Sequence, residues 1–81
     1  MAVTAGTYRH WKGPQYLVLG LGHDANDESR TVVVYVPLYP VDGPPFAVRE
    51  LEDFEAWVDP VTGAATPQGR GVQRFRRVEL P

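Results

Sequence analysis

The chain has 81 residues and a formal net charge of −2, which fits one domain, 1–81, with a small core and argues against nucleic-acid binding through bulk charge. It contains no cysteine, which excludes disulfides and thiolate metal sites and is compatible with a reducing cytoplasm. No segment approaches the ~18 apolar residues of a membrane span, and no secretory signal is visible, so we expect a cytoplasmic protein without membrane contact.

The spacing of prolines, glycines and short apolar runs along the chain predicts a small all-β domain. Eight prolines and eight glycines interrupt the sequence too often for long helices, and the runs between them are short and rich in valine, leucine and aromatic residues. These runs predict strands at 6–11, 16–21, 31–39, 46–49, 55–58 and 72–78. Leu51 and Phe54 lie three residues apart, which suits one helical or 3₁₀ turn at 50–54. We therefore predict a small, strongly bent antiparallel SH3-like barrel of five or six short strands, with an open sandwich as the alternative.

Several residues set the expected details of this sheet. Gly20 and Gly22 permit a bulge or a sharp bend at the end of the second strand. The polar segment 23–30 predicts an exposed loop. Strand 31–39 should be central, but Pro37 cannot donate a ladder hydrogen bond, so its second half must lie at an edge or a bulge. Segment 59–71 is long for a loop and predicts either a flap or an insertion.

Near the N-terminus, Tyr8, His10 and Lys12 alternate along the first predicted strand. Period-two alternation places these three hydrogen-bonding side chains on one face. Together with Tyr35, Tyr39 and Arg49, they are the candidate residues of a ligand site.

The motifs of the chain resemble those of a small bacterial domain-of-unknown-function family, numbered 1653, over nearly its whole length. They are Tyr8-x-His10-Trp11-Lys12-Gly13-x-x-Tyr16, His23, Tyr35-x-x-Leu38-Tyr39, Arg49-x-Leu51-x-x-Phe54 and Arg74-Phe75. The chain departs from the family pattern at Ala47 and Glu50 around Arg49, at Asp53, at Gln73 and after His23. The resemblance implies a fold and a set of candidate positions, and no reaction.

The histidines His10 and His23 allow either a structural or a metal-binding interpretation. Their separation matches no recognised ligand spacing, so we expect His10 to be a hydrogen-bonded structural residue and expect no metal or cofactor. The sequence also carries no nucleophile motif and no phosphate loop, which makes an enzyme the less favoured class.

The favoured hypothesis is a binding module for a small anionic or peptide ligand. The first alternative is a nucleic-acid contact through a basic C-terminal run with an aromatic residue within it, Arg70, Arg74, Phe75, Arg76 and Arg77. The second alternative is an accessory or minimal enzyme domain that uses His10 and Lys12. The partner is then an unknown small ligand or protein, and the chain is expected to be a monomer or a weak dimer.

Overall fold

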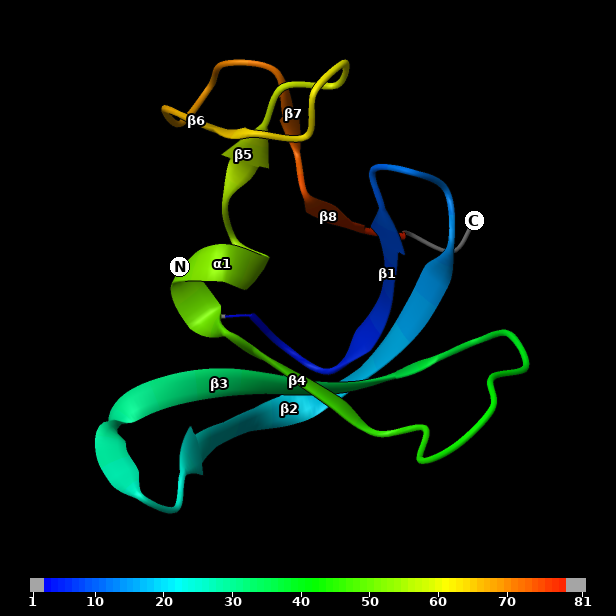
Figure 1. Cartoon of the computed structure of the whole chain (residues 1–81), viewed down its shortest axis with the longest axis vertical. Helices are drawn as coiled ribbons and strands as arrows, with labels where there is room; N and C mark the ends of the chain where they lie inside the picture. The colour runs from blue at the N-terminus through cyan, green and yellow to red at the C-terminus, as the bar shows by residue number, and fades with distance from the viewer. Residues whose placement is uncertain (1–2, 79–81) are drawn as a thin grey trace.

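The computed structural model describes residues 3–78, which form two antiparallel sheets and one helical turn (Figure 1). The larger sheet has five strands in the order β4-β3-β2-β1-β8, and the smaller has three in the order β6-β5-β7. In chain order the elements are β1 Gly6–His10, β2 Gln15–Asp24, β3 Asp27–Pro37, β4 Ala47–Glu50, α1 Leu51–Phe54, β5 Trp57–Val58, β6 Ala65–Thr66, β7 Val72–Gln73 and β8 Phe75–Arg77. The predicted mostly β class with one helical turn is confirmed.

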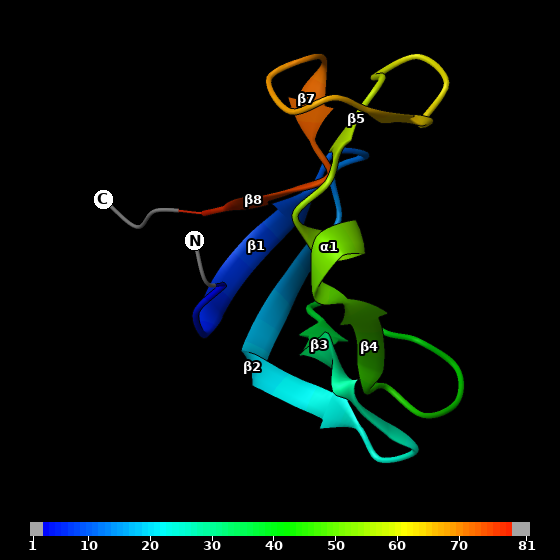
Figure 2. The same cartoon turned by 90° about the vertical axis from the view of Figure 1, so that its left-hand side faces the viewer.

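The larger sheet curls into a half-barrel around α1 (Figures 1 and 2). The register between β2 and β3 shifts between Val18 and Gly20, where an extra residue bends the strand. This is the bulge that the glycines predict. Pro37 also lies where expected, because β4 pairs with β3 from Val32 to Tyr35, and no other strand among the described residues pairs with the end of β3 on that side.

Two loop predictions are corrected by the structure. Segment 23–30 is mostly strand, since β2 and β3 continue through it and a tight turn joins Asp24 to Asp27. An Arg30 guanidinium paired with Asp24 and Glu50 stabilises this end of the sheet. Segment 59–71 consists mainly of turns, as predicted, but it includes the short strand β6, which pairs with β5 in the smaller sheet.

The predicted final strand 72–78 is also two strands, because β7 pairs with β5 while β8 pairs with β1. Arg74 lies at the crossing point, where its N–H donates to the Ala56 carbonyl and its carbonyl accepts from the Trp11 N–H. Gly71, which precedes β7, lets the backbone pass close to Val58 of β5. Its φ is +82°, and a Cβ at this position would overlap the Val58 carbonyl oxygen.

The core lies on the concave face and is mainly aromatic. Phe54 of α1 and Phe75 of β8 stack in parallel, with ring centroids 4.2 Å apart. Tyr8 and Tyr35 meet Phe54 edge-on, and Val18 and Val33 fill the sheet beneath them. Among residues 3–78, no helix is long and apolar enough to cross a membrane.

Candidate functional site

Polar side chains surround Phe75 on the concave face of the larger sheet. Ring centroids of His10, Tyr16 and Tyr35 lie 5.0, 5.8 and 5.7 Å from that of Phe75, all close to edge-on. Strand register explains the grouping, because His10 pairs directly with Phe75, and residues that pair across a ladder share a face. Aromatic edges in this geometry favour one arrangement of the rings. The polar atoms that they carry are therefore held in place.

Arg49 is the charged residue at the centre of this group. Alternation along β4 places it on the concave face, opposite Val33. Its Nε donates to the Tyr35 hydroxyl at 3.3 Å, and its Cζ lies 5.5 Å from the Phe75 ring centroid. Within residues 3–78, no carboxylate lies at ion-pair distance from it. The half-buried guanidinium is oriented by an aromatic ring and a hydroxyl, and its two terminal nitrogens remain available.

His10 adds a titratable group next to this guanidinium. Its Nδ1 accepts a hydrogen bond from the Lys12 backbone N–H at 3.2 Å, so the proton of the neutral ring lies on Nε2. Partial burial lowers the pKa of His10, and the positive charges of Arg49, Lys12 and Arg74 lower it further. The neutral imidazole thus presents an N–H donor in a region of excess positive charge.

Tyr16 and Tyr39 contribute a pair of hydroxyls, whose oxygens lie 2.8 Å apart. Burial and the hydrogen bond to Tyr39 raise the pKa of Tyr16 to about 12. Because one hydroxyl donates to the other, the second proton is free to donate elsewhere. We define the Arg49 cluster as the group of side chains around Phe75 that consists of His10, Lys12, Tyr16, Tyr35, Tyr39, Arg49 and Arg74.

The cluster contains most of the predicted ligand-site residues, with two differences. Tyr8 lies apart from it: its hydroxyl donates to the Thr4 carbonyl at 3.0 Å and its ring packs on Phe54. The predicted strand face for Lys12 is wrong, because β1 ends at His10 and a turn follows. Lys12 nevertheless comes close to His10 through that turn.

Sequence reasoning did not assign Tyr16 and Arg74 to this site. For Tyr16, the available signal was the hairpin register, which pairs it with Tyr8 and so places it on the same face. No local signal identifies Arg74, because it reaches the cluster only through the crossing between the two sheets. Its side chain also donates to the Asp53 carbonyl at 2.8 Å, at the end of α1.

The C-terminal arginines do not form one surface. Phe75 is buried in the core, with 6% of its surface exposed, and is not available for base stacking. Arg77 donates to Thr4 Oγ1 at 2.8 Å, whereas Arg76 is exposed and opposite Arg9. Arg70 lies in the loop before β7, where its carbonyl accepts from Thr66 Oγ1. Arg76 and Arg77 line one hollow of the surface, whereas Arg70 and Arg74 do not, so the four arginines do not lie on a single surface.

His10 and His23 lie near opposite ends of the β1–β2 hairpin, His10 beside its turn and His23 near the far end of β2. Within residues 3–78, no group of three or more histidine, aspartate or glutamate side chains is arranged to hold a metal ion.

Comparisons with known proteins agree with the fold and assign no activity. The family model described as "Protein of unknown function (DUF1653)" matches residues 6–77. A search of curated proteins finds no match. A crystal structure of a DUF1653 protein from Bordetella bronchiseptica is similar, with 38% sequence identity and a TM-score of 0.75, and the alignment covers 94% of this chain and 87% of that one. With a family model spanning almost all of its described residues and a solved structure of the same fold, the chain belongs to the DUF1653 family.

Proposed function

We propose that this protein is a binding module for a small anion, and that the Arg49 cluster holds the phosphate or carboxylate group of the ligand. The observation that carries the proposal is the state of Arg49. Its guanidinium is oriented by Tyr35 and Phe75 and has no carboxylate partner within residues 3–78.

The surrounding groups favour an anion over a neutral ligand. Lys12 and Arg74 add positive charge near His10, and together with Arg49 they lower the pKa of its imidazole. A bound anion offsets the repulsion between these positive charges. Carboxylate and phosphate groups also match the paired terminal nitrogens of an arginine, which can bind two oxygens at once.

The hydroxyl pair and the imidazole define how such a ligand is recognised. Tyr16 and Tyr39 offer one outward O–H donor between them, and His10 offers its Nε2–H. These donors suit the remaining oxygens of a phosphate monoester or a carboxylate. A peptide ligand fits the same description through its C-terminal carboxylate. Because the rings are already packed on Phe75, little side-chain freedom is lost on binding.

The test is an NMR titration of His10 in the presence and absence of inorganic phosphate, together with calorimetric titration of phosphate and acetate. Binding beside His10 stabilises the imidazolium, so its pKa should rise when phosphate is present. The Arg49→Gln variant should bind phosphate about tenfold more weakly, because a hydrogen bond to a charged group is lost.

The matched control is Arg30→Gln, which removes an arginine charge at the other end of the sheet, where Asp24 and Glu50 pair with it. Phosphate should bind this variant with unchanged affinity. If the two variants bind phosphate equally well, or if the His10 pKa does not respond to phosphate, the Arg49 cluster is not the anion site.

A further inference from the structure

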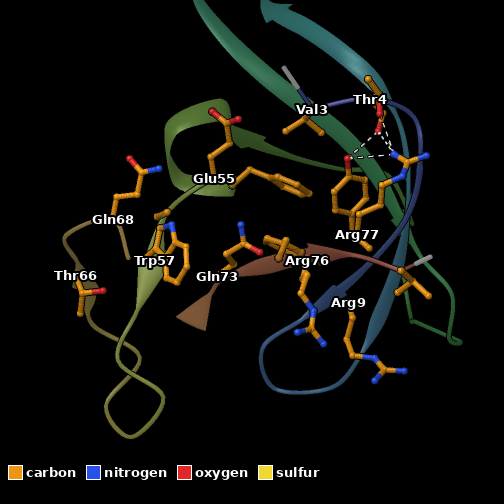
Figure 3. A pocket seen from close by; sticks show the side chains of 15 residues that line it. Val3, Thr4, Arg9, Glu55, Trp57, Thr66, Gln68, Gln73, Arg76 and Arg77 are labelled. Carbon is orange, nitrogen blue, oxygen red and sulfur yellow. Dashed lines mark hydrogen bonds between the residues drawn. The ribbon is translucent and has the colours of Figure 1, made fainter. Parts of the chain in front are cut away.

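Two arginines face each other on neighbouring strands outside the Arg49 cluster. Arg9 of β1 and Arg76 of β8 are directly opposite in the ladder, and both are exposed. Like charges at directly opposed positions destabilise a sheet. Within residues 3–78, neither guanidinium makes an ion pair or a side-chain hydrogen bond. Figure 3 shows both side chains extending to the same side of the two strands.

Arg9 and Arg76 line two hollows in the surface. The larger, with a volume of about 1190 Å³, is the open groove of Figure 3, and the smaller has a volume of about 370 Å³. Four residues line both hollows: Arg9, Arg76, Trp57 and Gln73. Glu55 is the acidic residue among those that line the larger hollow, and Figure 3 places it on the far wall. The shared wall therefore combines positive charge, an indole ring and an amide.

The larger groove also passes over an open strand edge. Its lining includes residues from both faces of β8, a strand that pairs, within residues 3–78, only with β1. An open groove of this kind can receive a ligand that continues beyond it in either direction.

We propose that this wall binds a nucleotide unit, with its phosphate on Arg9 and Arg76 and its base against Trp57. A guanidinium group can donate two parallel hydrogen bonds to two phosphate oxygens. An indole ring can stack on any of the bases. The Gln73 amide has both donors and an acceptor for a base edge. A ligand then explains why two arginines are directly opposite in the ladder, because a bound phosphate relieves the repulsion between them.

The side chains of this site differ from those of the anion site proposed above, although His10 lines the smaller hollow and Phe75 the larger. Arg9 and Arg76 alternate with His10 and Phe75 along their strands, so they lie on the opposite face of the sheet. The same nucleotide chemistry can come from a free nucleotide or from a single strand of DNA or RNA. The groove allows both, and the experiment separates them.

The experiment is a titration of intrinsic tryptophan fluorescence at low salt with three probes: inorganic phosphate, adenosine monophosphate and a dodecamer of deoxythymidine. We expect the dodecamer to quench the fluorescence and to bind more tightly than phosphate. Its affinity should fall with salt, with a slope of about −1.4 in log K against log salt if two phosphate contacts form. Quenching by adenosine monophosphate alone assigns the site to free nucleotides.

The variants Arg9→Ala and Arg76→Ala should each weaken binding about tenfold, and Trp57→Leu should remove most of the quenching. Neither arginine variant is expected to lose stability, since each removes a like-charge contact, so a thermal melt verifies their folding. Arg30→Ala is the matched control and should bind the dodecamer like the unaltered protein, whereas Arg49→Gln reports whether a probe binds at the Arg49 cluster instead.

Three results overturn the proposal: no binding of the nucleotide probes at low salt, equal binding by the Arg9→Ala/Arg76→Ala double variant, or affinity for phosphate equal to that for both nucleotide probes. If Arg49→Gln alone lost binding, the nucleotide would be bound at the Arg49 cluster and not at Arg9 and Arg76.

Discussion

Replacement of His10 by alanine tests whether this residue stabilises the fold. The substitution removes a half-buried ring from the end of β1 and leaves the backbone of the strand intact. It removes the edge contact with Phe75 at 5.0 Å and the acceptor for the Lys12 N–H. Both interactions lie where the first hairpin turn meets the core.

The two lost interactions give the size of the effect. An edge-to-face aromatic contact contributes about 0.5–1.5 kcal/mol, and an exposed hydrogen bond about 0.5–1 kcal/mol. Because the Lys12 N–H is exposed, water can replace the imidazole as its partner. We therefore expect the free energy of unfolding to fall by about 1–2 kcal/mol, which for a domain of this size lowers Tm by about 4–16 °C.

Urea unfolding followed by far-UV circular dichroism measures this change. His23→Ala is the matched control, since His23 is exposed near the far end of β2, and the loss of an exposed side chain should alter stability by no more than about 0.5 kcal/mol. A His10→Ala midpoint equal to that of the unaltered protein would refute the reasoning that His10 stabilises the fold.

Two further predictions concern the backbone and the tyrosine pair. Gly71→Ala should destabilise the protein by at least about 2 kcal/mol, because the positive φ costs about 1–2 kcal/mol and the new Cβ overlaps the Val58 carbonyl oxygen; Gly69→Ala, where the φ is also positive but the space is open, is the control for thermal melts. The raised pKa of Tyr16 favours its neutral form in the folded state, so its contribution to stability is present below pH 10 and is lost as pH rises towards 12. As pH rises from 10 to about 12, Tyr16→Phe should therefore lose less stability than the unaltered protein does. Parallel curves of stability against pH would contradict this assignment.

Local patterns in the sequence were sufficient for the elements whose partners lie nearby. The valines of β3 and the hairpin turn after β1 predict strands that pair within about 20 residues of each other. The bulge at Gly20 and the edge position of Pro37 follow from backbone chemistry alone. Polar segment 23–30 was misjudged because a strand exposed on both faces has no apolar alternation to reveal it.

The missed features depend on contacts between distant segments. The division between β7 and β8 occurs because Arg74 bonds to Ala56 on one side and Trp11 on the other. No property of strand 72–78 by itself marks this point. The opposition of Arg9 and Arg76 has the same origin, since it depends on the register between the first and last strands. Sequence reasoning therefore found candidate residue types more readily than their grouping.

The pairing of β1 with β8 also has a consequence for protein synthesis. β1 leaves the ribosome first, yet its neighbour on one side is made only after all the other strands. Phe75, which completes the aromatic core, arrives with that last strand. During translation the growing chain can form the β1–β2–β3 hairpins but cannot cover their apolar concave face. A ribosome-bound chain whose β8 is still inside the exit tunnel should therefore remain sensitive to protease and available to chaperones, and become resistant only after β8 emerges.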